Sequence, residues 1–239
     1  MKYSGLYFIP SPTAQPAESA ATASALTSSL ETHFHTLARG APWTLTYRLF
    51  RDTAPRADPE NPVSYAHSHT HLLTHTALSQ SRCYVHVSPP PGTRSASVVA
   101  IPFAQADAQA ALLRNQMAAL WSARHTLSIQ NGATYAGGLF AVQIGEVRVL
   151  REAQGGGVSS PGVVVCVSTV AGGEEDGVDG QDVDLEFAQA TIREFWGKVR
   201  EGRDLGRAEV REVFMAPEQG REDKDAMVRM WCEVLRLRG

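Results

Sequence analysis

The stretch HTLSIQNGATYAGGLFAVQIGEVRVLRE, residues 125–152, decides the fold class. Apolar and polar side chains alternate along most of it, which is the period of a strand with one buried face. The dipeptide Asn131–Gly132 is the strongest short-range hairpin signal, because both central positions of that turn require a positive φ. The alternation resumes after the break at Gly137–Gly138, and Gly145–Glu146 predicts a second tight turn. We therefore expect antiparallel strands joined by short turns.

Further strands are predicted on both sides of this stretch. In WTLTYRLFRD, residues 43–52, the side chains of Trp43, Leu45, Tyr47 and Leu49 point one way and the polar ones point the other. Residues 163–170, VVVCVSTV, are apolar on both faces, which predicts a central strand. Shorter strands are predicted in SGLYFIP, SRCYVHVS, SASVVAIP and EVREVFM, at residues 4–10, 81–88, 95–102 and 209–215.

Four segments carry apolar residues three and four apart, which is the spacing of an amphipathic helix. They span residues 13–38, 104–121, 182–199 and 222–239. In the second segment the predicted apolar stripe consists of Ala108, Leu112, Met117, Leu120 and Trp121. Together the segments predict an α+β fold, an antiparallel β-barrel-like sheet with flanking helices. We expect one domain over residues 1–239, with flexible loops near residues 53–62, 153–161 and 171–181.

The composition is ordinary for a globular protein and argues against some classes of partner. Of 239 residues, 43% are hydrophobic and 20% charged, and the formal net charge is -3. Such a chain has no global positive field to hold nucleic acid or an anionic membrane. No apolar run approaches the ~18 residues of a membrane helix, and the N-terminal run is too short for a signal peptide. The three cysteines form no CxxC pair, so neither a zinc ribbon nor a disulfide framework is indicated. We expect an intracellular, soluble protein.

A histidine cluster lies in AHSHTHLLTH, residues 66–75, and raises the question of a metal site. On a strand, His67, His69 and His71 would share one face, and three imidazoles on alternate positions can bind zinc. A catalytic zinc also needs carboxylates that fix the imidazole tautomers, and no acidic residue lies between Glu60 and Asp107. The HExxH and deaminase motifs are absent as well.

We therefore expect the histidines of residues 67–75 to lie on a solvated face and to bind no metal. In this interpretation Ala66, Ser68, Thr70 and Leu72 point inward. A proton switch is compatible with any exposed histidine cluster, although nothing in the sequence argues for one specifically.

Two other groups of residues were tested for catalytic chemistry. The carboxylates of Asp182, Asp184 and Glu186 would share a face of a strand and could bind a divalent metal, as in a phosphohydrolase tunnel. The following residues have helical spacing, which favours acidic residues at a helix start, with Asp182 as its cap. Cys83 and His86 are three apart and would face opposite sides of a strand, so they do not form a nucleophile–base pair.

The C-terminal segment VRMWCEVLRLRG, residues 228–239, contains three arginines. Arg229, Arg236 and Arg238 are interpreted as complementing the negative end of a helix dipole, because nearby acidic residues dilute the positive charge. No dinucleotide-binding, phosphate-loop or serine-hydrolase motif occurs. A globular body without a recognisable active site points to binding instead of catalysis.

Several segments together resemble the family of Mediator subunit 20, the TATA-binding-protein-related-factor family. They are SGLYFIP, WTLTYRLFRD, SRCYVHVS, HTLSIQNGATYAGGLFAVQIGEVR, REFWGKV and MWCEVLRLRG, which are spread over the whole chain. The resemblance implies a β-barrel-like fold with flanking helices and a non-enzymatic nuclear protein of the Mediator head module. It implies subunit 18 as the main partner, with a segment of subunit 8 nearby, and an indirect connection to RNA polymerase II.

The family's signature residues are structural, so the resemblance implies no catalytic, cofactor-binding or metal-binding residue, and it leaves the partner-binding residues unidentified. The leading hypothesis is a scaffold subunit that binds another protein through a sheet edge or barrel rim. The alternative is a metal- or phosphate-dependent hydrolase with a β-tunnel fold, using the histidine strand or the carboxylates of residues 182–186. A third class is a barrel that binds a small molecule in an empty apolar interior.

Overall fold

The computed structural model describes residues 2–53, 65–90, 92, 96–150, 158–170, 180–203, 205, 209–216 and 223–237. In these residues the chain forms a 10-stranded antiparallel sheet with the order β10-β1-β9-β8-β7-β3-β4-β5-β6, and β2 pairs with β7 off this path. The strands are β1 (Lys2–Pro10), β2 (Ala38–Arg39), β3 (Trp43–Asp52), β4 (His69–His75), β5 (Arg82–Ser88), β6 (Ser97–Pro102), β7 (Trp121–Gly137), β8 (Phe140–Val149), β9 (Ser159–Val170) and β10 (Arg211–Phe214).

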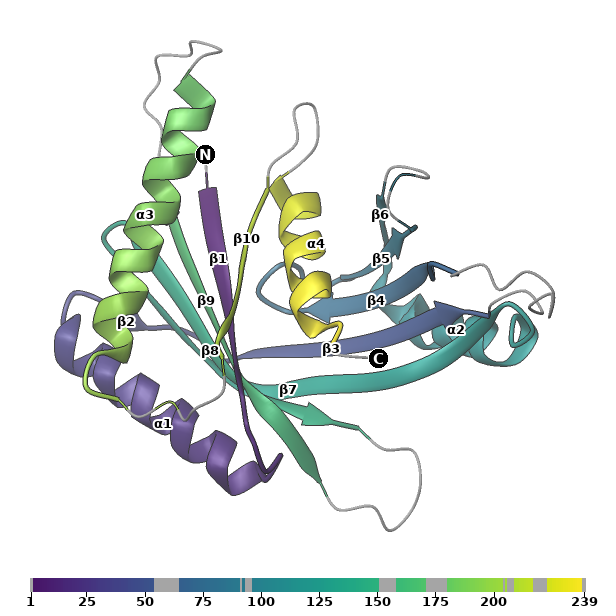
Figure 1. The fold of residues 1–239 in the computed structure, drawn as a ribbon, viewed down its shortest axis with the longest axis horizontal. Helices are drawn as coiled ribbons and strands as arrows, with labels where there is room; N and C mark the ends of the chain where they lie inside the picture. Colours follow the sequence, from purple (N-terminus) through teal and green to yellow (C-terminus); the bar gives the residue numbers. More distant parts are fainter. Residues whose placement is uncertain are drawn as a thin grey trace.

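The helices are α1 (Pro16–His33), α2 (Ala106–Ala111), α3 (Gly180–Arg200) and α4 (Asp223–Leu235). A short 3-10 turn, Phe103–Gln105, precedes α2, and a π-helical turn, Leu112–Gln116, follows it. The α+β class and the antiparallel sheet with flanking helices are confirmed. Figure 1 shows that the sheet is strongly bent, and among the described residues its end strands β10 and β6 do not pair, so it is not closed.

Two layers of helix cover opposite faces of the sheet. α1 and α3 pack against β1, β8 and β9, while α4 lies in the hollow of the bend against β1, β10, β4 and β5 (Figure 1). Neighbouring residues of β1 show the two faces, since Tyr7 packs with α3 residues and Leu6 packs with α4 residues, and both are at most 1% exposed. Burial of both faces explains why β1 and β9 carry long apolar runs.

A third, smaller cluster lies on the outer face of β3, β4 and β5. There α2 and the π-helical turn cover Phe50, Leu72 and Cys83, which pack against Ala110 and Leu113. The central strands are therefore buried on both sides for much of their length. A polar side chain in them has little access to solvent.

The predicted hairpin at Asn131–Gly132 is wrong, because β7 continues through it as far as Gly137. The pairing of β7 with β3 and β8 changes register here instead, which marks a bulge. The glycine is required by a close approach, since a Cβ on Gly132 would overlap the indole of Trp43. The indole N–H of Trp43 donates to the Ala133 carbonyl at 3.1 Å.

The predicted turn at Gly145–Glu146 is wrong for a similar reason. β8 runs without a break from Phe140 to Val149, and a Cβ on Gly145 would lie 2.9 Å from Cζ2 of Trp43. The turn between β7 and β8 falls instead at the break noted at Gly137–Gly138, where Gly138 has φ +57. Gly132 and Gly145 thus accommodate one tryptophan, and the turn itself is made by Gly138 and Leu139.

The helix predicted over residues 104–121 is partly wrong. The α-helical part is only Ala106–Ala111, and Trp121 is the first residue of β7, where it pairs with Asp52. The buried stripe is Ala106, Ala110 and Leu113 in place of the predicted one, and Leu120 is 58% exposed. Alanines dominate this segment and allow more than one apolar face, so the face that contacts the sheet was not fixed by periodicity.

The remaining helices and strands follow the sequence pattern, except that the helix predicted over residues 13–38 ends at His33 and Ala38 lies in β2, which was not predicted. Leu26 and Leu30 of α1 are fully buried, as are Val163 to Val165 of β9. Apolar residues spaced three and four apart in the last helix are all buried in α4, namely Met227, Met230, Trp231, Val234 and Leu235. Of the three predicted loops, residues 54–62, 153–157 and 171–179 lie outside the described residues. Residues 159–161 belong to β9 and residues 180–181 to α3. No described helix is long and apolar enough to cross a membrane.

Candidate functional site

The histidine strand is β4, and the prediction that its imidazoles face solvent is wrong. His71 is 2% exposed and His75 1%, while His69 is half-buried. Thr70 and Leu72 are buried on the opposite face, as predicted for inward residues, but Ala66 is exposed and Ser68 is half-buried, because both precede the strand. The error has one cause: α4, from the other end of the chain, covers the face that the histidines share.

The buried imidazoles pack as flat rings in the interior. His75 stacks on Trp43 at 4.7 Å between ring centroids with an interplanar angle of 6°, and its edge contacts Trp231 at 4.8 Å. His71 stacks on His86 of β5 at 5.0 Å. Loss of hydration in the interior disfavours the imidazolium form, so burial lowers the pKa of His71 to about 2 and that of His75 to about 3.

The ring nitrogens are engaged by the protein's own groups. His71 Nδ1 lies 2.8 Å from the Tyr47 hydroxyl, His75 Nδ1 accepts from the N–H of Ala77 at 3.2 Å, and His86 Nδ1 lies 3.0 Å from the Ser97 carbonyl. Among the described residues no group of three or more His, Cys, Asp or Glu side chains could hold a metal ion. The imidazoles therefore serve as aromatic and hydrogen-bonding components of the core.

The carboxylate and thiol groups singled out in the sequence are not brought together. α3 begins at Gly180, so positions 182, 184 and 186 lie on a helix, where 182 and 186 are one turn apart on one side and 184 lies on the other; the three do not share a face as they would on a strand, and the helical interpretation is confirmed. Asp182 was expected to cap this helix. The helix starts two residues earlier, at Gly180, so Asp182 lies inside it and the expected cap is wrong. Cys83 is buried under α2 while His86 lies on the α4 side, and burial raises the pKa of the Cys83 thiol to about 11.

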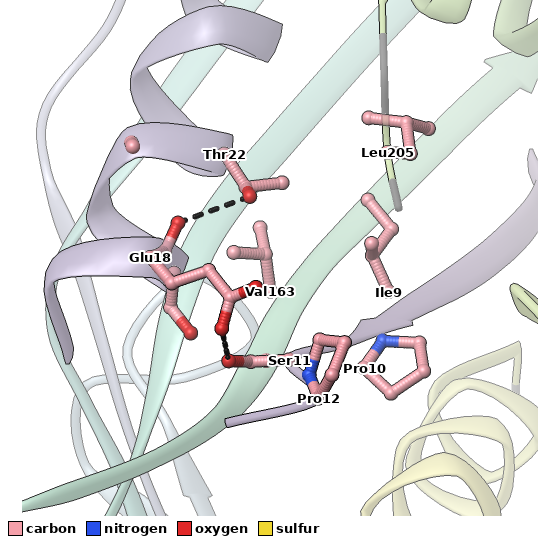
Figure 2. A pocket seen from close by; sticks show the side chains of 11 residues that line it. Ile9, Pro10, Ser11, Pro12, Glu18, Thr22, Val163 and Leu205 are labelled. Carbon is pink, nitrogen blue, oxygen red and sulfur yellow. Dashed lines mark hydrogen bonds between the residues drawn. The ribbon is translucent and has the colours of Figure 1, made fainter. Parts of the chain in front are cut away.

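One cavity, of about 320 Å³, lies between the start of α1 and the end of β1 (Figure 2). Its carboxylate belongs to Glu18, which accepts hydrogen bonds from Ser11 at 2.5 Å and Thr13 at 2.6 Å. These bonds lower the pKa of Glu18 and tie the first turn of α1 to the chain that leaves β1. The groups lining this cavity are thus used to anchor α1.

A second, polar cavity of about 220 Å³ lies between α4 and the sheet. Its lining comes from two sources: His71, His86 and Ser88 on β4 and β5, and Arg229, Glu233 and Arg236 in or just after α4. From the sequence, the arginines are interpreted only through the helix dipole. No local pattern points to this site, because its strand and helix residues are more than 140 positions apart in the chain.

The most exposed apolar strand is β6, at one end of the sheet. Val99 is 56% exposed, Phe103 just beyond the strand is also 56% exposed, and Ala100 is exposed. Among the described residues β6 pairs with β5 alone. The Phe103 N–H donates to the Ser81 carbonyl at 2.9 Å, so alternation along the strand directs the N–H and C=O of Ala100 to the free edge.

β6 can therefore accept another strand. Its unpaired backbone groups offer hydrogen bonds, and its apolar side chains offer contact area. The segment was predicted as a strand from SASVVAIP, but its position at the end of the sheet was missed. Pro102 was the available signal, because proline in a sheet is confined to edge strands, bulges and strand ends.

The chain was compared with known proteins. The model of the family described as "TATA-binding related factor (TRF) of subunit 20 of Mediator complex" matches residues 1–235. No curated protein sequence matches the chain. A conserved hypothetical protein from Pyrococcus furiosus is similar with 10% identity and a TM-score of 0.44, over 87% of this chain and 94% of that one.

Two further solved structures are similar. The Schizosaccharomyces pombe Mediator head module contains a chain with 13% identity and a TM-score of 0.40, over 90% of this chain and 100% of that one. A putative adenylyl cyclase from Hippeastrum, described as having a dominant triphosphatase activity, has 11% identity and a TM-score of 0.38, over 87% and 92%.

Proposed function

The chain belongs to the family of TATA-binding related factors of subunit 20 of the Mediator complex, and we propose that it is a non-enzymatic scaffold of the Mediator head module. The family match over residues 1–235 carries this proposal. As a Mediator subunit it acts in regulating transcription by RNA polymerase II, and its place of action is the nucleus.

The partner in this proposal is Mediator subunit 18, with a segment of subunit 8 nearby. The docking edge is β6, where a strand of subunit 18 pairs with the outward backbone groups of Val98 and Ala100. Three observations support this edge: the free backbone groups, the 56% exposure of Val99 and the 56% exposure of Phe103. The opposite end of the sheet, β10, is shorter at four residues and its hydrophobic side chains are not fully exposed.

The hydrolase alternative has no comparable support. The carboxylates of residues 182–186 lie on a helix, and the Nδ1 atoms of the buried histidines on β4 and β5 contact groups of the protein itself. Burial also raises the pKa of Cys166 to about 12 and raises that of Cys232, so both thiols stay protonated and weakly nucleophilic near neutral pH.

The proposal is tested by co-purification of this chain with subunit 18. Ala100→Pro removes the outward N–H but leaves the ladder to β5, whose bonds come from the alternate residues. We expect it to abolish co-purification, whereas Ala100→Ser, which keeps the N–H, retains it. Thermal unfolding of both variants, matching that of the parent, shows that the chain still folds.

Retention of subunit 18 by Ala100→Pro at the parent level refutes docking at this edge. If the parent chain itself fails to bind subunit 18 or any reconstituted head module, the scaffold role is refuted as well.

A further inference from the structure

The polar cavity beneath α4 is lined by basic and hydrogen-bonding side chains from the helix and the sheet. One buried nitrogen among them, His71 Nε2, has no hydrogen-bond partner among the described residues. Arg229 and Glu233 are four residues apart, and Arg236 follows three residues later, so they lie on one side of the helix axis. His71, His86 and Ser88 line the cavity from the strands. Any occupant would therefore contact α4 and the sheet together.

His71 contributes a buried hydrogen-bond donor. Its Nδ1 lies 2.8 Å from the Tyr47 hydroxyl, which is a normal hydrogen bond, while that hydroxyl is 3.4 Å from the Cys232 carbonyl, at the outer limit. If the phenol proton is assigned to the shorter of these two contacts, it goes to Nδ1, and the proton of the neutral ring then sits on Nε2. That Nε2 is buried and has no hydrogen-bond partner among the described residues. A buried donor left without a partner is costly, so a ligand that accepts from it is favoured.

His86 contributes the opposite chemistry. Its Nδ1–H donates to the Ser97 carbonyl at 3.0 Å, so Nε2 of the neutral ring carries a lone pair. Burial lowers the pKa of His86, which keeps the ring neutral near pH 7. Arg229 and Arg236 line the same cavity and attract an anion, and the lone pair of His86 can accept a hydrogen bond from it. An anion that retains an O–H is therefore favoured.

Glu233 is the acidic residue among those that line the cavity, and it also favours an anion that retains an O–H. Its carboxylate lies 3.6 Å from the Arg211 guanidinium, which offsets part of its charge. It remains a hydrogen-bond acceptor that lines the cavity from α4, while His86 lines it from β5. A fully deprotonated tetrahedral anion would meet repulsion at both acceptors, whereas one that carries a proton can donate to either.

We propose that this cavity is a binding site for free inorganic phosphate, held by Arg229, Arg236, Ser88 and His71 and recognised through its P–O–H by His86 and Glu233. Inorganic phosphate retains at least one proton at pH 7. Sulfate does not, and a phosphate monoester, whose second pKa is ≈ 6, is mostly fully deprotonated. Guanidinium groups match the oxygens of such an anion with several donors at once.

Isothermal titration calorimetry of the full chain at neutral pH tests the proposal with three probes: inorganic phosphate, sulfate and phosphoserine. We expect saturable one-to-one binding of phosphate and weaker binding of the other two. Arg236→Gln removes an exposed side chain and should weaken phosphate binding on the order of tenfold or more, because charge-assisted bonds are lost. Lys198→Gln, a charge-matched change on α3, should bind phosphate as the parent does.

Glu233→Gln addresses the selection itself. We expect the ratio of the phosphate affinity to the sulfate affinity to decrease. The variant loses the negative charge that repels sulfate, while the arginines that attract both anions remain. No saturable binding of phosphate overturns the site. Sulfate or phosphoserine binding as tightly as phosphate overturns the recognition of P–O–H, and equal affinities for Arg236→Gln and Lys198→Gln overturn the location.

Discussion

The burial of His75 leads to a stability that falls as the pH is lowered. An imidazole in the unfolded chain takes up a proton near pH ~6.5, whereas burial holds the pKa of His75 in the folded chain at about 3. Below pH ~6.5 the unfolded chain therefore binds a proton that the folded chain does not, and acid favours unfolding. His71, with a pKa of about 2, acts in the same direction.

The size of the effect follows from linkage. Each such group lowers the free energy of unfolding by ~1.4 kcal/mol per pH unit below pH ~6.5. Between pH ~6.5 and pH ~5, His75 and His71 together cost about 3 kcal/mol, roughly half from each, because an unfolded imidazole is only half protonated at pH ~6.5. This window lies above the usual carboxylate pKa values of ~4, so the acidic residues contribute little to the slope.

The assay is urea denaturation followed by tryptophan fluorescence at pH ~7, ~6 and ~5, comparing the parent with His75→Phe. A phenyl ring keeps the stacking on Trp43 and the contact with Trp231 but does not titrate. At pH ~7 we expect the free energy of unfolding of the variant to be about 1 kcal/mol lower than that of the parent, because the N–H of Ala77 loses its acceptor. Between pH ~6.5 and ~5 the free energy of unfolding of the variant should fall by about 1.5 kcal/mol less than that of the parent.

Leu73→Val is the matched control, since Leu73 is fully buried on the same face and does not titrate. It should lower the free energy of unfolding by about 1 kcal/mol at each pH, and leave the pH dependence as it is in the parent. If His75→Phe shows the same pH dependence as the parent, the imidazole of His75 is not held neutral in the folded chain and the reasoning fails.

Further perturbations test other parts of the structure. Gly132→Ala should destabilise the chain by about 1–3 kcal/mol in urea denaturation, because the new Cβ meets the indole of Trp43; an unchanged stability would contradict the close approach. Leu30→Ala should cost about 2–5 kcal/mol by the same measurement, since Leu30 of α1 is fully buried between that helix and the sheet, and a loss below ~1 kcal/mol would argue against that packing. The three buried cysteines should react with a thiol reagent only as fast as the chain unfolds, so rapid labelling of the native protein would be inconsistent with their burial. Co-expression with subunit 18 should raise the soluble yield of the chain, whose exposed apolar edge promotes self-association when alone, and equal yields with and without the partner would count against that edge.

Local periodicity predicted most strands and helices but failed where one side chain reaches across the sheet. Trp43 shows this most clearly, since it requires glycine at two positions on two neighbouring strands. From the sequence alone, those glycines are indistinguishable from turn glycines, because turn chemistry and close packing select the same residue. The pair at 137–138 was noted only as a break in the alternation, and the structure places the turn at Gly138 and Leu139.

The polar face of β4 shows a second limit. The alternating histidines were predicted to be solvated. A two-residue period shows which residues share a face of a strand, but it does not show which element covers that face. Leu73 lies between His71 and His75 on that same face and was the only local sign of burial. The covering element, α4, is more than 140 residues away in the chain. The wide apolar surface of α4 itself was the only sequence feature that indicated its burial.

The burial of α4 bears on where a partner can bind. Eight of its thirteen residues are buried, including Trp231 and Val228, so the helix is enclosed by the bent sheet. A partner segment that used the hollow of the bend would have to displace α4 and expose that apolar surface, at about 1.5–3 kcal/mol for each large apolar side chain. Pairing at β6 requires no such displacement, because Val99 and Phe103 are already exposed and the backbone of Ala100 already faces outward. The cost of opening the hollow therefore favours the sheet edge as the docking surface, with α4 kept in place as part of the folded subunit.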